Sequence, residues 1–556
     1  MSQTSALPAD TDVMIVGCGP CGLMLANELG RRGIRAVLVD AKAWTAFNPQ
    51  ANATQARSME HYRRHGFGDE IRALGMPADF PPDIAYFTRM AGYELARFEM
   101  PRAKDAKDVI RGLSGSWSAA ELPHRVSQKY VEQVLLKHAR KYAANSVHFN
   151  TRLVSFTDHG SHVECITEPA GGGQQTVTRA QYLVGADGAR STVRRALGVN
   201  LSGESGVQRE FMGGRMYAVY LRCPDYYSAM PHKPAWMNVT VNAQQRCFMT
   251  AIDGKEEFAY HFQLKPGQDE DAITDEEAKR QVCIGFGVEL PMDILSRVSW
   301  TAGYTLVADR MRIGRVLIGG DAAHLFTPAG GMGYNTAIED AVNMGWKLAA
   351  LVRGKAGETL LQSYEDERRA IAVRNTGFAR KLADSLGGFA ATPELEMAAP
   401  EGDKARAVAG EYYNRHARIE FNIPGFTFGA RYDGSPVICP DGTAPPPDGP
   451  NIYHPTACPG GRAPHMWLDD GRSLYDTFNL EWTLLRLRPD AETAGFESSF
   501  ADAGLDLQIV DHPDSRLREL YEADLALVRP DQIVAWRGTG AGADMTAIVR
   551  QVAGLA

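Results

Sequence analysis

A short glycine-rich segment, Gly17-Cys18-Gly19-Pro20-Cys21-Gly22, carries two overlapping patterns of residues that can do chemistry. The first pattern is G-x-G-x-x-G, in which Gly17 permits a tight turn and Gly19 lets the backbone approach a pyrophosphate. Gly22 lets the following helix pack closely against the preceding strand, and Pro20 stands at the start of that helix. Because free N–H groups at a helix N-terminus bind phosphate oxygens, this pattern predicts a dinucleotide site.

The second pattern is Cys18-Gly19-Pro20-Cys21, which matches the thioredoxin-type redox motif. Only 17 residues precede Cys18, which is too few for the fold that leads into such a motif. A redox dithiol also needs a lowered thiol pKa, whereas a pyrophosphate at the same helix N-terminus would raise it. We therefore interpret the two cysteines as small residues in a closely packed loop.

The residues around this loop predict a βαβ unit. Residues 13–16 form an apolar run short enough for a buried strand, helical spacing follows, and residues 36–39 form a second apolar run. A βαβ unit implies a parallel sheet. Asp40 ends the second run, where a carboxylate can accept hydrogen bonds from a ribose diol. Strand, helix, strand and acid in this order favour dinucleotide binding over an ordinary glycine-rich turn.

Two more apolar runs each end in a tight turn that contains an aspartate. Residues 182–184 lead into Gly185-Ala186-Asp187-Gly188, and residues 315–318 lead into Gly319-Gly320-Asp321. Folds of the α/β class place ligands at the carboxyl ends of their strands. Taken singly, Asp187 and Asp321 could equally be turn residues or helix caps. Taken with the glycine-rich loop, in this order, they predict a single ligand site.

The three turns together resemble those of the class A flavoprotein aromatic hydroxylases, which are FAD monooxygenases similar to para-hydroxybenzoate hydroxylase. The sequence more closely resembles the phenol hydroxylase branch, and segments 461–465 and 528–537 look like the C-terminal domain of that branch. The resemblance implies an α/β fold: a Rossmann-type FAD-binding domain, an interleaved β-sheet substrate domain and a C-terminal thioredoxin-like domain. It also implies that FAD is bound tightly and without a covalent bond.

The resemblance assigns cofactor-binding residues position by position. The glycine-rich loop corresponds to the ADP-binding fingerprint of the family, Asp187 to its Asp-Gly motif, and Asp321 to the aspartate that meets the ribityl chain. The turn 330–335 departs from the commoner Gly-Gly-Gln-Gly-Met-Asn, because Tyr334 stands where relatives have a thioether. The predicted FAD contacts are Gly17, Gly19, Pro20, Gly22, Asp40, Arg57, Gln128, Asp187, Asp321, Pro328, Gly331, Met332, Gly333 and Asn335.

The predicted FAD-binding body covers residues 1–390. The substrate sheet is predicted to be inserted into this body at about 80–125 and 200–300, because residues 205–265 have the texture of strands.

A helical and linker segment is predicted for residues 391–450, followed by the thioredoxin-like domain at 451–556. The stretch from Asp433 to Pro464 is rich in proline, glycine and aspartate, which is typical of a linker. Cys458 is the only cysteine of the C-terminal domain, so this domain has no redox cysteine pair.

Ring hydroxylation with dioxygen needs a redox cofactor, because side chains cannot perform it. The resemblance implies an NAD(P)H-dependent monooxygenase that hydroxylates a phenolic substrate through a flavin C4a-hydroperoxide. The turn 330–335 precedes a helix of good periodicity, whose N–H groups and dipole can stabilise anionic reduced flavin. The chain has one clear G-x-G-x-x-G, so NADPH or NADH would bind transiently, and the resemblance favours NADPH.

Several other functions compete with this interpretation. A hydroxylase of polycyclic, polyketide-type aromatics would have the same motifs. A non-hydroxylating FAD protein is disfavoured by the intact Asp187 and Asp321. A flavin halogenase is disfavoured because the sequence lacks Trp-x-Trp-x-Ile-Pro.

Three residues in the predicted substrate sheet are candidates for handling a phenol. Tyr217 or His261 could relay the phenolic proton, and Arg215 could hold an anionic group of the substrate. Each of them also fits a packed aromatic residue or a surface arginine. His324, beside the Gly-Asp turn, is interpreted as a structural residue and not as a catalytic base.

Composition narrows the class of protein further. The chain has 556 residues with 67 acidic and 59 basic side chains, a balance that does not suggest nucleic-acid binding. No run of 18 apolar residues predicts a membrane span, and the first ten residues resemble no secretory signal. Eight scattered cysteines fit a reducing cytoplasm, and no metal site is predicted. We expect a cytoplasmic enzyme with a small aromatic substrate; the resemblance also makes a homodimer plausible.

Overall fold

The computed structural model describes residues 7–206, 211–265 and 267–555. Its first layer is a sheet of eight strands: β1 (Asp10–Val16), β2 (Ala36–Val39), β5 (Asn145–His148), β6 (Thr151–Asp158), β7 (Val163–Pro169), β8 (Thr176–Gly185), β16 (Arg312–Ile313) and β17 (Val316–Ile318). Strands β17, β8, β1, β2 and β5 run parallel in that order, as the predicted βαβ unit requires. Their apolar residues are buried on both faces, which explains the uninterrupted apolar runs of the sequence.

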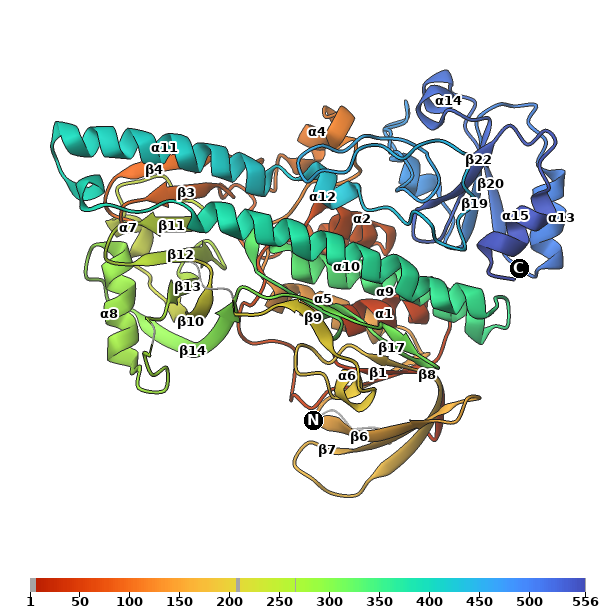
Figure 1. The fold of residues 1–556 in the computed structure, drawn as a ribbon, viewed down its shortest axis with the longest axis horizontal. Helices are drawn as coiled ribbons and strands as arrows, with labels where there is room; N and C mark the ends of the chain where they lie inside the picture. Colours follow the sequence, from red (N-terminus) through yellow and green to blue (C-terminus); the bar gives the residue numbers. More distant parts are fainter. Residues whose placement is uncertain (1–6, 207–210, 266, 556) are drawn as a thin grey trace.

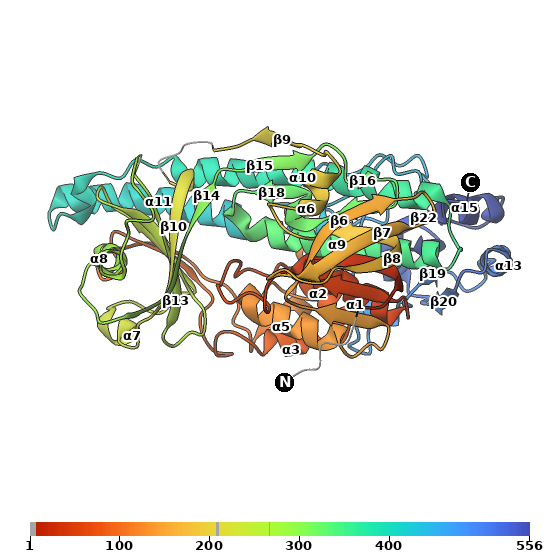
Figure 2. The same ribbon diagram turned by 90° about the horizontal axis from the view of Figure 1, so that it is seen from below.

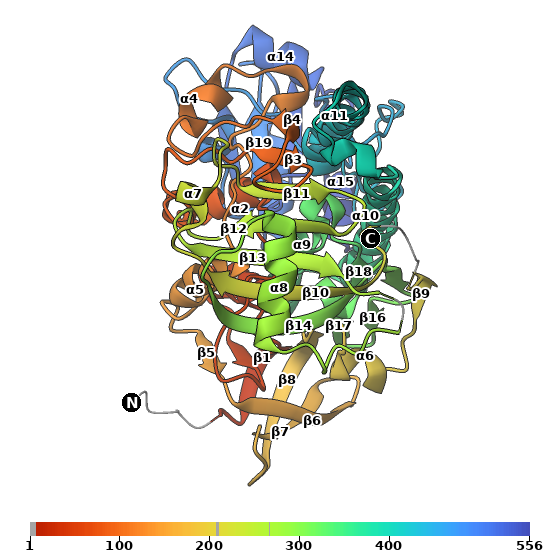
Figure 3. The ribbon, with the colours of Figure 1, turned by 90° about the vertical axis from the view of Figure 1, so that its left-hand side faces the viewer.

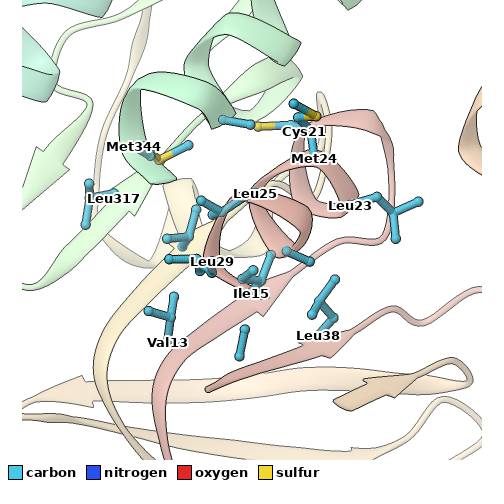
Figure 4. Packing of buried hydrophobic residues seen from close by; sticks show 14 of the residues in the cluster. Val13, Ile15, Cys21, Leu23, Met24, Leu25, Leu29, Leu38, Leu317 and Met344 are labelled. Carbon is cyan, nitrogen blue, oxygen red and sulfur yellow. The ribbon is translucent and has the colours of Figure 1, made fainter. Parts of the chain in front are cut away.

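Two helices, α1 (Pro20–Arg31) and α9 (Met332–Val352), pack on this sheet and against each other. Figure 4 shows Leu25 and Leu29 of α1 beside Val13 of β1, with Leu317 and Met344 completing the core. The helix begins at Pro20 directly after the glycine-rich loop, so the loop is fixed between a buried strand and a buried helix.

The second layer is a separate seven-stranded sheet in the order β14-β10-β13-β12-β11-β3-β4. Its strands are β3 (Ile84–Phe87), β4 (Glu94–Phe98), β10 (Gly214–Arg222), β11 (Met237–Val241), β12 (Arg246–Ala251), β13 (Glu257–Gln263) and β14 (Asp293–Ala302). Helix α8 (Asp275–Phe286) covers one face of this sheet, as Figure 3 shows, and buries Val282 and Phe286 in the same core. The other face is turned toward the first layer.

Long helices connect the two sheets. Helix α10 (Glu358–Gly387) contributes Leu361 and Tyr364 to the first core and Leu386 to the second. Helix α11 (Pro400–Phe421) then runs beside β3 and β4, and α10 and α11 lie along the molecule in Figure 1. The remaining elements of this body are α2 (Ala56–Arg64), α3 (Gly68–Arg72), α4 (Ala106–Arg111), α5 (Gln128–Ala139), α6 (Thr192–Ala196), α7 (Tyr226–Ala229), α12 (Pro424–Phe428), β9 (Leu201–Glu204), β15 (Thr305–Ala308) and β18 (His324–Phe326).

The C-terminal domain is a four-stranded sheet in the order β20-β19-β21-β22 with three helices. Figures 1 and 2 place it at the opposite end of the molecule from the second sheet. Its elements are β19 (Trp482–Arg486), β20 (Leu507–Asp511), β21 (Leu525–Val528), β22 (Val534–Gly538), α13 (Ala494–Asp502), α14 (Ser515–Tyr521) and α15 (Met545–Val552). The predicted fold class, an α/β FAD-type body with an interleaved sheet and an added C-terminal domain, is confirmed.

Between α12 and the C-terminal sheet, the described residues 429–473 contain neither helix nor named strand. The middle of this stretch, 441–450, is largely exposed, whereas its two ends hold single bridges between Arg431 and Gly461 and between Arg462 and Ile533. None of the described helices is long and apolar enough to cross a membrane. Among the described residues, no cluster of acidic, histidine or cysteine side chains is arranged to hold a metal ion.

A buried ionic cluster joins the C-terminal domain to the body. Glu367 of α10 accepts hydrogen bonds from Arg529 at 2.7 and 2.9 Å and from Lys347 of α9 at 2.6 Å. Arg529 also donates to Asp531 at 2.6 Å. Burial alone would raise the pKa of Glu367, but Arg529 and Lys347 hold it well below its usual value. Arg529 of the C-terminal domain therefore shares a carboxylate of α10 with Lys347 of α9, the helix that carries part of the predicted site.

Candidate active site

The three predicted turns lie side by side at one edge of the first sheet. Parallel pairing aligns the ends of neighbouring strands, with Val16 beside Gly185 and Ile318 also beside Gly185. Backbone hydrogen bonds then join adjacent turns: Ala186 N–H donates to Val16 at 2.8 Å, and Gly319 N–H donates to Gly185 at 3.0 Å. The turns that carry Gly19, Asp187 and Asp321 therefore border one region, as a single large ligand requires.

The glycine-rich loop has the geometry of a phosphate cradle. A Cβ on Gly17, whose φ is +111°, would lie 2.1 Å from the Ala186 oxygen, and a Cβ on Gly22 would lie 1.9 Å from the Gly17 oxygen. A Cβ on Gly19 would meet no atom within 4 Å. Helix α1 has no side-chain cap at its N-terminus, so its first N–H groups are free to bind an anion.

Asp40 fixes the same loop from the neighbouring strand. Its carboxylate accepts the Cys18 N–H at 2.8 Å and the Lys42 N–H at 2.8 Å, and the second lone pair of each oxygen stays available for a ribose hydroxyl. Cys18 and Cys21 are both buried and unpaired, and burial raises the pKa of each thiol well above its usual value. This environment suits packed thiols and opposes thioredoxin-type chemistry.

Asp187 lies at the start of α6, where it binds backbone. Its carboxylate accepts the Ser191 hydroxyl, the Thr192 N–H at 2.6 Å and the Val193 N–H at 3.2 Å. Within this chain, the side chain of Asp187 therefore caps the N-terminus of α6, which was the alternative interpretation of this residue. Arg194 follows on the same helix and donates to the Ala322 oxygen at 3.0 Å, which ties this turn to the Gly-Asp turn.

Asp321 stands differently from Asp187. Its side chain is exposed and, among the described residues, receives no hydrogen bond. The surrounding protein nevertheless displaces enough water to raise the pKa of this carboxyl. A carboxylate in this situation is free to accept hydrogen bonds from a ligand hydroxyl.

Asp340 of α9 holds the Gly-Asp turn from behind. Its fully buried carboxylate accepts the Gly320 N–H at 3.0 Å, His324 Nε2 at 2.7 Å and Arg368 Nε at 2.8 Å. Burial alone would raise the pKa of Asp340, but His324 and Arg368 lower it to about 2. His324 is thus a buried partner of Asp340, in keeping with its interpretation as structural. Asp340 was not among the predicted site residues, although a carboxylate among the apolar positions of a helix is a signal that the sequence offers.

The N-terminus of α9 forms the second cradle. Gly330 and Gly331 have φ values of +73° and +66°, and α9 has no side-chain cap. Asn335 Oδ1 accepts the Gln55 N–H at 2.8 Å and the Ser58 hydroxyl at 2.7 Å, while its Nδ2 donates to the Ala53 oxygen at 2.9 Å. Asn335 therefore clamps the segment that precedes α2 onto this helix end.

Other predicted FAD residues have side chains occupied within the chain. Arg57 donates to Glu60 at 2.9 Å and to Gln532 of the C-terminal domain at 2.8 Å. Gln128 donates to Glu132 at 2.6 Å.

In the 328–335 turn, some side chains are buried in the protein and others are exposed to solvent. Met332 is buried with Ile423 and Phe426, and Pro328 is exposed. A Cβ on Gly333 would lie 3.4 Å from Phe326. The Tyr334 hydroxyl is bonded to the Tyr62 hydroxyl of α2, so its extra oxygen has a partner in the protein.

Strand register separates the residues proposed to handle a phenol. In the β10–β13 pair, Tyr217 lies opposite Phe262 and Ala218 opposite His261, so Tyr217 and His261 occupy opposite faces of the sheet. Tyr217, 3% exposed, faces α8 and accepts a hydrogen bond from Arg297 at 3.2 Å. Arg215 has the same parity and forms an ion pair with Glu270. The structure therefore does not bring Tyr217 and Arg215 together with His261.

The face of His261 carries a half-exposed aromatic group. His261 stacks on Phe248 with a ring separation of 4.4 Å and meets Trp300 edge-on at 5.8 Å. Val298 of the edge strand β14 lies on the same face and is 46% exposed. Accessible aromatic side chains on a sheet face suit the binding of an aromatic ligand.

Residues 47–55 link this face to the α9 cradle. Asn48 accepts the Ser296 hydroxyl at 2.6 Å, and Asn52 donates to the Thr250 hydroxyl at 3.3 Å. At the other end of the segment, a Cβ on Gly331 would lie 2.9 Å from the Ala53 Cβ. The aromatic face and the helix end thus lie on the two sides of one short segment.

His261 is a hydrogen-bond donor at neutral pH. Burial lowers its pKa to about 3, so the ring is neutral. Trp300 Nε1 donates to Nδ1 of His261 at 3.3 Å, which places the ring proton on Nε2. The side chain can stabilise an oxygen anion but does not readily accept a proton.

Comparisons with known proteins agree with this site. Residues 10–379 match the family described as FAD binding domain, and residues 456–556 match the family described as aromatic-ring hydroxylase, C-terminal. The chain belongs to the class A flavoprotein aromatic hydroxylases. It is a flavin-dependent aromatic monooxygenase, and its cofactor is FAD.

Relatives of this chain differ in what their names say they act on. It is 30% identical to phenol 2-monooxygenase of Pseudomonas sp. (strain EST1001), over 96% of this chain and 91% of that protein. The rebeccamycin biosynthetic enzyme RebC with reduced flavin has a TM-score of 0.87 at 30% identity, covering 99% and 100% of the two chains. Aklavinone-11 hydroxylase with FAD and aklavinone has a TM-score of 0.82 at 26% identity, covering 99% and 100%.

Proposed function

We propose that this hydroxylase uses NADPH or NADH and dioxygen to hydroxylate a phenolic ring bound against the aromatic face of the second sheet. The observation that carries the proposal is the half-exposed group of Phe248, His261 and Trp300, joined by residues 47–55 to the uncapped end of α9. The similarity to phenol 2-monooxygenase supports a phenolic substrate.

The residues at the two cradles fit FAD. The loop 17–22 and the N-terminus of α1 would hold the pyrophosphate, Asp40 a ribose diol, and Asp321 the hydroxyls of the ribityl chain. The N-terminus of α9 would face the flavin ring and favour negative charge there. Bound FAD supplies the two-electron and oxygen chemistry that side chains lack.

The chain itself orients the substrate and controls its charge. Phe248 and Trp300 pack against an aromatic ring, and His261 Nε2–H donates to the phenolic oxygen. Such a hydrogen bond stabilises the ionised phenol, which makes the ring more electron-rich.

A polycyclic aromatic substrate is the second candidate. The face toward the first layer spans β12, β13, β10 and β14, and its accessible Val298 lies beside the His261 row. A surface of this extent suits fused rings as well as a single phenol. The similarity to aklavinone-11 hydroxylase supports this alternative.

The test is a turnover assay on FAD-loaded enzyme. NADPH and NADH oxidation would be followed with phenols, naphthols and hydroxyanthraquinones, while hydroxylated product and hydrogen peroxide are both quantified. We expect product with one class of phenol, and a loss of kcat/KM of about tenfold or more in His261→Phe, because one hydrogen bond to a charged oxygen is removed. Tyr217→Phe, on the opposite face, serves as the matched control and should retain kcat/KM within about threefold.

Two results would contradict the proposal. Coenzyme oxidation that yields only hydrogen peroxide with every phenol would exclude this substrate class. An equal loss of kcat/KM in His261→Phe and Tyr217→Phe would exclude the assigned face.

A further inference from the structure

Glu420 of α11 is a buried carboxylate that contacts the turn at the start of α9. It is 6% exposed, and its Oε1 accepts the Gly330 N–H at 3.0 Å. Its Oε2 lies 2.7 Å from Nε2 of His416, whose Nδ1 lies 3.0 Å from the Ser385 hydroxyl of α10. Helix α11, which runs beside the second sheet, therefore contacts the second cradle through this carboxylate.

Glu420 lacks the close cation that accompanies most buried carboxylates of this protein. Among the described residues, every buried carboxylate except Glu420 and Glu132 has a lysine or arginine nitrogen within 4 Å. Glu420 has His416 in that place. Glu132 of α5 accepts the Ala46 N–H at 2.7 Å, in the segment that follows Asp40. Both exceptions therefore hold backbone that borders the FAD site.

The turn that Glu420 contacts is fixed from two sides. Gly330 and Gly331 both have left-handed backbone, and the Gly330 oxygen accepts Gln55 Nε2 at 2.9 Å. The Gly331 oxygen accepts Asn335 Nδ2 at 2.6 Å. These bonds come from the first layer, whereas the bond from Glu420 comes from α11. Glu420 therefore holds the Gly330 N–H in a turn whose carbonyl oxygens are already held by the body.

A buried cation interacts with Glu420 without forming an ion pair with it. Arg125, just before α5, is 4% exposed, and its guanidinium lies 5.8 Å from the ring centre of Phe421, the residue after Glu420. Burial lowers the pKa of Arg125 to about 10, and the attraction of Glu420 opposes this shift. Arg125 is therefore charged at neutral pH and offsets the charge of Glu420 only in part.

We propose that Glu420 is a positioning residue that, through Gly330, keeps the reduction potential of bound FAD low. This inference rests on the proposed function, which places the flavin ring at the N-terminus of α9. The helix dipole there favours the negative charge that reduction adds to the flavin, whereas a buried carboxylate at the same turn opposes that charge. The balance of the two sets how strong a reductant the cofactor is when it meets dioxygen.

The test measures the two-electron midpoint potential of the FAD-loaded enzyme by dye-coupled reduction, without an aromatic substrate. Glu420→Gln keeps an oxygen for the Gly330 N–H but loses the charge. Reduced FAD should then gain about tenfold in affinity over oxidised FAD, which is a rise of about 30 mV. The matched control is Glu411→Gln, which removes an exposed carboxylate of the same helix and should leave the potential unchanged. Arg125→Met removes the opposite charge and should lower the potential.

A second pair of variants separates the charge of Glu420 from its hydrogen bond. Glu420→Leu loses both the charge and the bond to Gly330, so it should raise the potential and also bind oxidised FAD about tenfold more weakly. Glu420→Gln should bind oxidised FAD within about threefold of the native protein, because its amide oxygen still accepts the Gly330 N–H. Equal affinities of Glu420→Gln and Glu420→Leu for oxidised FAD would show that Glu420 does not act through Gly330.

The inference is overturned by an unchanged or lowered potential in Glu420→Gln, by an equal rise in Glu411→Gln, or by a potential that does not fall in Arg125→Met. FAD content and melting temperature show whether each variant is folded. If Glu420→Gln does not retain FAD, Arg125→Met decides alone by the same criterion. Hydroxylation of a phenol by an enzyme whose potential is independent of Glu420 refutes this inference alone. Shifts of the expected sign in an enzyme that forms no hydroxylated product refute the proposed function alone.

Discussion

Replacing Asp340 of α9 should lower both the stability of the protein and its retention of FAD. Its carboxylate is fully buried, carries the charge that balances Arg368, and fixes the Gly320 N–H of the turn that presents Asp321. Asp340→Asn removes that charge and leaves a buried guanidinium poorly compensated. Breaking one partner of a buried ion pair costs about 3–5 kcal/mol.

This cost translates into a melting temperature. For a cooperative unit of about 370 residues, the unfolding entropy is about 0.8 kcal/mol per kelvin, so Asp340→Asn should melt about 4–6 °C lower. The assay is a thermal scan that records flavin fluorescence, which reports release of FAD, alongside circular dichroism. We expect both transitions to move together and FAD to be released at a lower temperature.

The matched control is Glu339→Gln, one residue earlier on α9. Glu339 also contacts Arg368, at 3.3 Å, but it is partly exposed, so its loss should cost less than about 1 kcal/mol. The double variant Asp340→Asn/Arg368→Met should be more stable than Asp340→Asn alone, because it no longer contains the uncompensated cation. The reasoning is refuted if Asp340→Asn melts within 1 °C of the native protein, or if Glu339→Gln loses as much.

Three further predictions follow from the same site. Gly19→Ala should fold normally and bind FAD about 10- to 100-fold more weakly, because the added methyl group meets no protein atom and points into the cradle. Gly22→Ala should instead destabilise the protein, because its Cβ would lie 1.9 Å from a backbone oxygen. Equal FAD affinity of Gly19→Ala and the native protein would contradict the assignment of the cradle. Asp340 and Glu60 both have a pKa of about 2, below their ordinary 3.8 and 4.5, so their stabilisation of about 2–3 kcal/mol each is complete above pH 4.5 and is lost as pH falls toward 2. Urea unfolding at pH 3 and 6 checks this, and equal stability at the two values would contradict it. Burial raises the pKa of the Cys18 and Cys21 thiols, so both should resist iodoacetamide at pH 8 in the folded enzyme and react after unfolding. Mass spectrometry would record the alkylation. Rapid alkylation of either cysteine in the folded enzyme would contradict this prediction.

The cofactor site was largely predictable because its determinants are local. Gly17, Gly22 and Asp40 lie within one βαβ unit, and parallel strands necessarily end at the same edge of a sheet. The Gly-Asp turn at 319–321 follows a strand of the same sheet, so its place beside the glycine-rich loop also followed from the pattern.

The side-chain partners within that site were less predictable. Arg57 was expected near FAD, but it bonds with Gln532, which lies 475 residues away in sequence. Its partner belongs to the C-terminal domain, and no local sequence pattern predicts that this domain packs against α2.

The sequence by itself determined where the strands, the helices and the phosphate loop form, because apolar periodicity and glycine positions act over a few residues. Only the tertiary structure decided which face of the second sheet meets the first layer. That choice puts His261 on the accessible face and Tyr217 against α8, because neighbouring residues of a strand point to opposite sides and packing partners select the side.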